Sequence, residues 1–352
     1  MKLLIIRFSS IGDIVLTTPV VRCLALQTKA EVHYLTKKCF GSIVQNNPYL
    51  KKIWLFDNSD KNLIQQLRAE KFDGIIDLHN NLRSIKISWQ LSVKRNTFNK
   101  LNFEKWILVR FKKNILPPIH IVDRYLAAVK KLGIVNDGKG LDFFIDEKNT
   151  VDTTSLFTNT DIFLKTNAQL TTNNQQLTTN NYVALVIGAA HATKRLPTHK
   201  LIELINSIKQ PIILIGGKDD TAVATEIENT VLRNDVVNTC GKLNLQQSAS
   251  IIQNATYVIT HDTGMMHIAA AFDKKIISVW GNTVPEFGMY PYLKTVSQQL
   301  FADTHINEVK NLPCRPCSKI GFNTCPKKHF ACMELQNVES IAETANYMSN
   351  LD

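Results

Sequence analysis

Short apolar runs alternate with stretches of helical periodicity over the first 145 residues of the chain. The runs are rich in β-branched and aromatic residues and short enough for strands; they are LLIIRF, VHYLT, KIWLF, GIIDL and LDFFI. Residues 62–70 and 123–132 lie between runs and repeat apolar side chains at helical spacing. This alternation predicts βαβ units and a parallel sheet covered by helices on both faces.

The same alternation restarts at residue 182. The predicted strands there are YVALVIG, PIILIGG, VVNTCG, YVIT and KIISVWG. Predicted helices cover residues 198–208, 221–232, 246–253 and a segment from Gly264, and residues 338–348 form a last amphipathic segment. Two similar α/β units predict a cleft between two Rossmann-like domains, with ligands at the carboxyl ends of the strands.

The segment between the two units has a different composition. Residues 152–181 are dominated by Thr, Asn and Gln, and QLTTNN occurs twice, at 169–174 and 176–181. Such a tract buries too little apolar surface to offset its ordering entropy, so we predict a linker or loop. The predicted parts of the chain are a first domain at 1–151, a linker at 152–181, a second domain at 182–335 and a C-terminal helix within 336–352.

The composition is that of a globular protein, and its charge is basic. The 352 residues suffice for two domains, and 44% of them are hydrophobic. Lys and Arg number 41 against 30 Asp and Glu, so the net charge of +11 predicts an anionic partner or surface. No apolar run reaches the ~18 residues of a membrane span, and Arg7 interrupts the N-terminal run too early for a signal peptide. We therefore expect neither a membrane span nor secretion.

The first candidate site is RFSSIGDIVLTTP, directly after the first predicted strand. Ser9, Ser10 and Gly12 make a small polar turn whose backbone N–H groups can bind an anion or a hydroxyl-bearing ligand. Asp13 is either a helix cap, which the helix dipole favours, or a functional carboxylate at the mouth of the cleft. The turn lacks the glycines of a dinucleotide fingerprint and the ending of a Walker loop.

The second candidate site is VIGAAHATKRLP, at the start of the second unit. His191, Lys194 and Arg195 follow a predicted strand there. Cationic side chains beside exposed amides suit a diphosphate, and a solvated basic loop is the alternative.

The third candidate site is ITHDTGMMHIAAA. Thr263 and Gly264 would open a helix whose amides bind an anion, Asp262 would hold a sugar hydroxyl, and His267 lies one turn into the helix. A tight turn is the alternative for this segment alone. Three polar strand ends at one cleft favour a ligand site.

In this order the segments resemble glycosyltransferase family 9, the ADP-heptose:lipopolysaccharide heptosyltransferases. The resemblance runs over nearly the whole chain, through IRFSSIGDIVLTTP, DLHNNLRS, HIVDRYLAAVKKLGI, GAAHATKRLP, LIGGKDD, HDTGMMHIAAA and CRPCSKIGFNTCPKKHFACM. It implies an α/β GT-B fold, with two facing Rossmann-like domains, a central cleft and a C-terminal helix that returns to the first domain.

The resemblance also implies roles for single residues. Asp13 of the SSxGD turn is the expected general base, and Lys194 is the expected contact of the donor diphosphate. The other expected donor contacts are His191, Asp262, Thr263, Gly264 and His267. The expected acceptor contacts are Ser9, Ser10, Gly12 and Arg124. One departure is that Ala189 and Ala190 stand before His191, where the family has hydroxyl residues.

The implied reaction is inverting glycosyl transfer. An acceptor hydroxyl attacks the anomeric carbon while Asp13 takes its proton, and Lys194 with helix-terminal amides neutralises the leaving nucleoside diphosphate. The sequence contains no Asp-x-Asp, which favours a protein clamp over a metal ion. We expect no metal and no cofactor.

A basic stretch lies in the first domain. Residues 83–113 hold nine Lys or Arg and one acid, Glu104, interleaved with aliphatic and aromatic residues. The concentration suggests an anionic, membrane-embedded acceptor and an anionic inner-membrane surface. The alternative is a solvated face whose apolar residues belong to the core. No recognisable nucleic-acid-binding module accompanies the stretch, so we expect no nucleic acid partner.

Four of the seven cysteines crowd into one segment: Cys314, Cys317, Cys325 and Cys332. Their spacing, C-x2-C-x7-C-x6-C, would allow a tetrahedral zinc site, and reduced thiols in a compact loop are the other reading. A disulfide scaffold would spread its cysteines more widely, so we predict a reduced, cytoplasmic protein, peripheral on the inner membrane.

The leading hypothesis is therefore heptosyl transfer from ADP-heptose to the lipopolysaccharide inner core. A transferase that uses another nucleotide sugar in surface-glycan assembly is the second hypothesis. A non-catalytic protein that binds nucleotide sugars is the third, and the intact Asp13 disfavours it.

Overall fold

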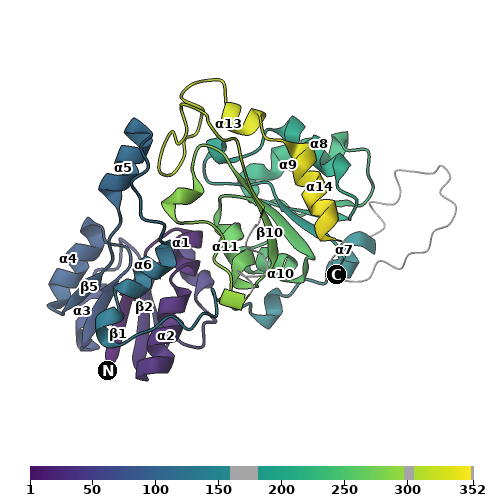
Figure 1. The fold of residues 1–352 in the computed structure, drawn as a ribbon. Helices are drawn as coiled ribbons and strands as arrows, with labels where there is room; N and C mark the ends of the chain where they lie inside the picture. Colours follow the sequence, from purple (N-terminus) through teal and green to yellow (C-terminus); the bar gives the residue numbers. More distant parts are fainter. Residues whose placement is uncertain (159–180, 297–304, 350–352) are drawn as a thin grey trace. The chain divides into compact units, whose positions relative to one another are not determined.

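The computed structural model describes residues 1–158, 181–296 and 305–349, which fold into two compact units (Figure 1). Unit 1 consists of Met1–Phe144, Ala270–Asp273 and residues 285–296. Unit 2 consists of the other described residues. Each unit has a fully parallel sheet flanked by helices, which confirms the predicted fold class. The cleft expected between the units stays a prediction.

The sheet of unit 1 has five strands in the order β3-β2-β1-β4-β5. The strands are β1 (Lys2–Ile6), β2 (Glu31–Lys37), β3 (Lys52–Phe56), β4 (Gly74–Asp77) and β5 (Arg95–Thr97). The first four coincide with predicted runs. The sequence of β5 carries no apolar pattern, and its parallel ladder with β4 is what holds it extended. The prediction of a strand at LDFFI was wrong: Leu141 and Phe143 are buried, but the segment joins neither of the two sheets that the described residues form.

Within the described residues, six α-helices lie between or after the strands of this sheet. They are α1 (Ile11–Val15), α2 (Thr18–Thr28), α3 (Leu63–Ala69), α4 (Leu82–Leu91), α5 (Asn102–Phe111) and α6 (Ile121–Ala127). The stretch Ile11–Thr28 is the one part of the described chain with the length and mean hydropathy of a membrane span. Two thirds of it lie buried inside the protein, and Val15, Val20 and Leu24 are fully buried. Helices α1 and α2 therefore pack as core elements of unit 1.

The sheet of unit 2 has six strands in the order β11-β10-β9-β6-β7-β8. The strands are β6 (Val183–Val186), β7 (Ile212–Ile215), β8 (Val236–Asn238), β9 (Tyr257–His261), β10 (Lys275–Trp280) and β11 (Ile306–Glu308). The main helices are α8 (Thr198–Ser207), α9 (Thr221–Thr230), α10 (Leu245–Asn254), α11 (Gly264–Ala271) and α14 (Val338–Met348), with shorter α7 (Thr153–Thr158) and α13 (Ala331–Glu334). All five strands predicted for this half are present, and β11 is an addition at the edge.

The C-terminal helix departs from expectation. The family resemblance implied that it returns to the first domain, but α14 packs against α8 and β10 of unit 2. Its residues Val338, Ile341, Ala345 and Met348 are buried in the same hydrophobic core as Leu204. The physical reason is local: the apolar face of α14 is already buried against the hydrophobic core of unit 2.

The predicted domain limits also change. The first segment of unit 1 ends at Phe144, seven residues before the expected boundary. The unit also includes Ala270–Asp273 and residues 285–296, which were expected in the second domain. Aromatic contacts account for this: Phe272 meets Phe143 edge-on, and Tyr292 donates a hydrogen bond to Asp123. The predicted linker begins at residue 152, but its first residues form the short helix α7 (Thr153–Thr158) instead of a loop, and residues 159–180 of it lie outside the described residues.

Candidate active site

In each unit the chain first adds strands on one side of its first strand and then crosses to the other side. We call the pair of neighbouring strands at which this happens the reversal point. In unit 1 it proceeds from β1 to β2 and β3 on one side and then continues with β4 on the other side of β1. In unit 2 the equivalent pair is β6 and β9. Loops leave such a pair in opposite directions, so the carboxyl ends of the two strands form a ligand-binding crevice. All three predicted polar motifs directly follow β1, β6 or β9.

Asp13 is the third residue of α1, and its carboxylate is held from two sides. The backbone N–H and the hydroxyl of Ser10 both donate to Oδ2, at 3.1 and 2.9 Å. The Arg7 guanidinium forms an ion pair with Oδ1 at 2.6 Å. The carboxylate thus does cap the first turn, as one of the two interpretations predicted, yet its side chain remains 22% exposed.

Arg7 is a site residue that sequence reasoning missed. Its side chain is 9% exposed, and it donates to the carbonyl oxygens of Ser9 and Leu78 and to the hydroxyl of Tyr125. Burial alone would raise the pKa of Asp13, but the Arg7 charge and the Ser10 hydrogen bonds outweigh it and hold that pKa below its ordinary value. Asp13 is therefore ionised at neutral pH. The sequence shows Arg7 only as a cation that follows an apolar run, and this position does not by itself indicate a site residue.

His79 follows β4, the partner of β1 at the reversal point. Its ring meets Phe8 edge-on, and Nδ1 has no hydrogen-bond partner within the described parts of the chain. Burial, followed by the charges of Arg7 and Lys100, lowers the pKa of His79 to about 4, so the ring is neutral at physiological pH. The turn is fixed by the fully buried Asp77, which accepts hydrogen bonds from the N–H of His79 and from Arg95.

Arg124 lies in α6 of unit 1 and is buried. Its guanidinium donates to the carbonyl oxygens of Phe287 at 3.1 Å and Lys100 at 3.4 Å. Burial lowers the pKa of Arg124. The structure thus gives this side chain backbone partners, and its contact with an acceptor stays a prediction.

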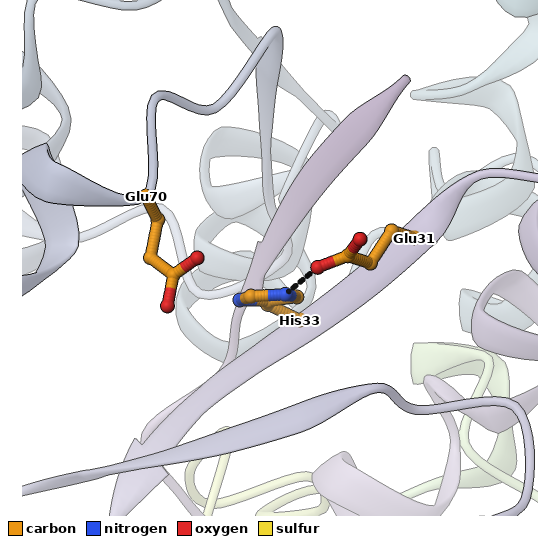
Figure 2. Close-up of side chains that lie close together, drawn as sticks. All are labelled: Glu31, His33 and Glu70. Carbon is orange, nitrogen blue, oxygen red and sulfur yellow. Dashed lines mark hydrogen bonds and ion pairs between the residues drawn. The ribbon is translucent and has the colours of Figure 1, made fainter.

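A separate cluster of Glu31, His33 and Glu70 has the composition of a metal site (Figure 2). It is the one group of three such side chains within 4.8 Å of one another among residues 1–158, 181–296 and 305–349. However, Glu70 is paired with Lys2 and Lys52, at 2.8 and 2.9 Å. Glu31 also begins β2, at the opposite end from the reversal point. Its carboxylates are thus neutralised by lysines, and we assign the cluster a structural role.

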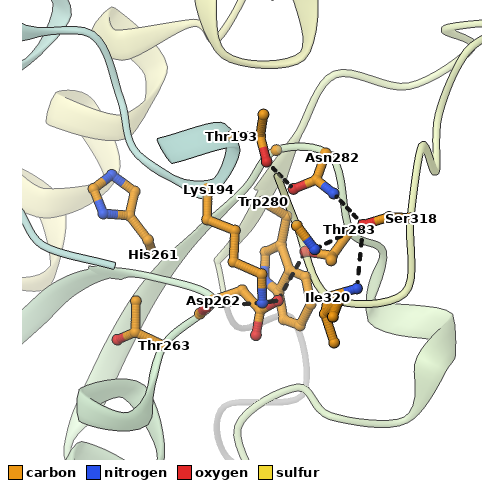
Figure 3. Close-up of polar contacts among 12 residues, drawn as sticks. Thr193, Lys194, His261, Asp262, Thr263, Trp280, Asn282, Thr283, Ser318 and Ile320 are labelled. Carbon is orange, nitrogen blue, oxygen red and sulfur yellow. Dashed lines mark hydrogen bonds and ion pairs between the residues drawn. The ribbon is translucent and has the colours of Figure 1, made fainter. Parts of the chain in front are cut away.

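In unit 2 the structure brings Lys194 and Asp262 into direct contact (Figure 3). Lys194 Nζ lies 2.5 Å from Asp262 Oδ2, which also accepts the Thr283 hydroxyl at 2.8 Å. The two side chains are 15% and 11% exposed. Lys194 closes the short helix Ala192–Lys194 after β6, whereas Asp262 follows β9. Two motifs about 70 residues apart therefore form one charged pair at the reversal point.

Of the remaining predicted donor contacts, three are half-buried and one is buried. Thr263 and Gly264 are half-buried where α11 begins, with the Thr263 hydroxyl accepting from the N–H of Met265 at 3.2 Å. His191 is also half-buried, and its Nδ1 has no hydrogen-bond partner in the described structure. His267, by contrast, is 2% exposed, so its ring is not at the surface. Arg195 donates to the Ala189 carbonyl and pairs with Asp220, so it serves the loop.

The loop that carries the cysteines borders this site, which the sequence did not reveal. The Thr193 hydroxyl contacts Asn282 and accepts from the N–H of Phe322, and Ser318 accepts from Asn282 (Figure 3). Cys314 Sγ lies 3.8 Å from His329 Nε2. The four predicted thiols do not meet within 4.8 Å, and none of the seven cysteines, which all lie among the described residues, forms a disulfide.

Comparisons with known proteins converge on one family. A family model described as glycosyltransferase family 9 (heptosyltransferase) matches residues 61–316. The chain is 27% identical over 301 residues to lipopolysaccharide heptosyltransferase 1 of Campylobacter coli, an alignment that covers 80% of this chain and 84% of that protein. It is 37% identical over 100 residues to lipooligosaccharide heptosyltransferase 2 of Haemophilus influenzae, covering 27% and 29% of the two chains.

The fold has solved counterparts as well. The structure of E. coli ADP-heptose lps heptosyltransferase II matches with a TM-score of 0.70 at 16% sequence identity, and the match covers 100% of this chain and 99% of that one. At this identity the likeness bears on the fold alone, and it agrees with the architecture of two parallel α/β sheets.

Proposed function

This chain belongs to glycosyltransferase family 9, the heptosyltransferases, and on that premise we propose how its two units carry out heptosyl transfer to the inner core of lipopolysaccharide. Unit 2 binds the donor, ADP-heptose, and unit 1 binds the lipopolysaccharide acceptor. One observation carries the proposal: Asp13 in unit 1 and the Lys194–Asp262 pair in unit 2 each follow the strands at which the sheet order reverses.

The donor diphosphate takes over Lys194 from Asp262. A diphosphate carries more negative charge than one carboxylate, so it attracts the Lys194 ammonium while Asp262 keeps its hydrogen bond from Thr283. The amides at Thr263 and Gly264 add N–H donors at the start of α11. His191 and His267 complete the proposed donor set, with His267 acting from inside the helix.

The acceptor is bound by the turn formed by Ser9, Ser10 and Gly12 and by Arg124. An acceptor hydroxyl oxygen bonds to the anomeric carbon of the donor, and the bond from that carbon to the diphosphate oxygen breaks. The hydroxyl proton passes to Asp13, and the bonding pair leaves with the ADP. Because Arg7 holds the pKa of Asp13 low, the carboxylate is ionised and can accept a proton, but it is a weak base. The proton therefore transfers late, when the attacking oxygen has become acidic.

The leaving diphosphate is neutralised by Lys194 and helix-terminal amides, without a metal ion. Two features support this assignment: the sequence contains no Asp-x-Asp, and Lys194 lies in the loop region that follows β6, at the end of the short helix Ala192–Lys194. Transfer is accordingly metal-independent, and no cofactor takes part.

The acceptor also sets the location. Lipopolysaccharide is lipid-anchored, so the enzyme works in the cytoplasm, peripheral on the anionic inner face of the inner membrane. The basic stretch supports this: Arg83, Lys86, Lys94, Arg110, Lys112 and Lys113 are all exposed. Nearby Lys and Arg side chains each contribute about 1 kcal/mol of attraction to an anionic leaflet.

The proposal is tested by a transfer assay with ADP-heptose and a soluble, delipidated core acceptor, run beside a thermal-shift panel of ADP-, UDP-, GDP- and CMP-sugars. We expect transfer, and the largest stabilisation by the ADP-sugar. Preferential stabilisation by a UDP- or GDP-sugar would replace the donor. Donor binding without transfer to any core acceptor would favour the non-catalytic hypothesis.

A further inference from the structure

Helix α5 exposes a cluster of aromatic rings. Phe103, Trp106 and Phe111 are 65%, 50% and 62% exposed. The rings of Phe103 and Trp106 are stacked with centroids 6.1 Å apart, and Phe111 meets Trp106 edge-on at 5.4 Å. We call these three residues the ring cluster. Leu108 is the one residue of α5 that is buried, so the rings do not belong to the core that the interleaved pattern suggested.

A contiguous exposed aromatic cluster requires an explanation. Isolated apolar side chains are common on protein surfaces, but clusters mark surfaces that become covered by a partner or a membrane. In Figure 1, α5 stands apart from the sheet of unit 1, beyond β5 and α4. The cluster therefore lies on a projecting element of this unit.

The charges around the ring cluster identify its partner. Arg110, Lys112 and Lys113 are exposed at the end of α5, and Glu104 is the single acid between residues 83 and 113. Lysine is depleted at the centres of protein interfaces. Aromatic rings bordered by Lys and Arg are instead the pattern of helices that lie in the headgroup region of an anionic bilayer.

Helix α4 repeats the pattern on a smaller scale. Leu82, Ile85 and Trp89 are 87%, 42% and 84% exposed, at spacings of three and four residues that place them on one face. Arg83 and Lys86 are exposed beside them. Two successive helices of unit 1 thus combine exposed apolar side chains with exposed cations.

We propose that α5 is a membrane-inserting element: the ring cluster enters the headgroup region of an anionic bilayer while Arg110, Lys112 and Lys113 pair with lipid phosphates. This deepens the membrane docking proposed above and rests on it, but it is independent of the assignments of base and donor. Docking then has a salt-sensitive part from the cations and a salt-insensitive part from the rings.

Tryptophan fluorescence provides a direct test, because the chain has four tryptophans in two classes. Trp54 and Trp280 are 6% and 1% exposed, whereas Trp89 and Trp106 are exposed. In a Trp89→Phe variant, Trp106 is the one exposed tryptophan. We expect its emission to shift to shorter wavelength on addition of phosphatidylethanolamine–phosphatidylglycerol vesicles, and brominated lipid to quench it. A variant that also carries Trp106→Phe should show neither effect.

Binding measurements separate the two contributions. Replacing the ring cluster with alanines should weaken vesicle co-sedimentation at least about ten-fold at high salt. The reason is that the favourable free energy of transferring each ring from water into the bilayer is lost. Replacing Arg110, Lys112 and Lys113 with Gln should weaken it mainly at low salt. All these variants should keep their activity on the soluble acceptor, which tests the transferase assignment separately.

Two results would overturn the inference. Vesicle binding at low salt with no change in Trp106 emission would leave electrostatic docking but exclude insertion. A change of oligomeric state in the alanine variant, with vesicle binding unaltered, would assign the ring cluster to contact with a second copy of the chain.

Discussion

The Arg7–Asp13 pair makes a prediction about the pH dependence of transfer. At an effective dielectric of about 20, unit charges ~4 Å apart interact by about 4 kcal/mol, so Arg7 is a major stabiliser of the Asp13 carboxylate. In an Arg7→Met variant, burial becomes the dominant influence and raises the pKa of Asp13. The acid limb of the pH profile of kcat/KM should therefore move to higher pH.

The measurement is a pH series of kcat/KM with ADP-heptose and the soluble acceptor. The parent enzyme should keep its rate well into the acid range, since its base stays ionised there. Arg7→Lys keeps the charge and should keep the limb near its parental position. Removing one partner of a buried ion pair costs ~3–5 kcal/mol of stability, so each variant must first be shown to be folded at the assay temperature. Superimposable profiles for the parent and Arg7→Met would refute the reasoning.

Three further predictions concern the metal, the donor and the acid stability. Transfer should survive excess EDTA, and a complete loss restored by Mg²⁺ or Mn²⁺ would overturn the protein clamp. Lys194→Gln should lower kcat/KM for the donor roughly 10- to 100-fold, the loss of one charge-assisted hydrogen bond, whereas Lys200→Gln in α8, where the half-buried lysine pairs with Glu203, should leave it unchanged. Burial lowers the pKa of His261 to about 3 from 6.5, so stability should fall as the pH drops from 6.5 towards 3. The free energy of unfolding, measured by denaturant titration, should fall by at most ~1.4 kcal/mol per pH unit, and less in His261→Gln than in the parent.

Much of the fold could be predicted because parallel strands that are buried on both faces have nearly continuous apolar sequences. All five strands predicted for unit 2 are present. The failures came from elements whose conformation depends on distant partners: β5 is extended because it pairs with β4, and Leu141 and Phe143 of LDFFI are buried without forming a strand. The family resemblance implied the wrong partner for the C-terminal helix, and its amphipathic pattern could not correct this, because the pattern indicates a buried face but not which sheet covers it.

The candidate site was only partly predictable. The spacing in the sequence indicated which strand ends would be polar, and Lys194 and Asp262 do meet there. It could not reveal Arg7, because a cation within an apolar run gains meaning only when α1 returns Asp13 to its guanidinium. The aromatic residues of α5 were equally ambiguous, since periodicity does not distinguish a side chain that faces the core from one that is exposed.

The central claim is that Asp13 is the general base and not only a helix cap, and one substitution separates the two roles. Asp13→Asn keeps an oxygen that can accept the Ser10 N–H but removes the basic group. With ADP binding and folding verified by calorimetry, single-turnover transfer should fall about 10²- to 10⁴-fold, or ~3–5 kcal/mol of barrier. Turnover close to that of the parent enzyme would contradict the account and leave Asp13 as a cap.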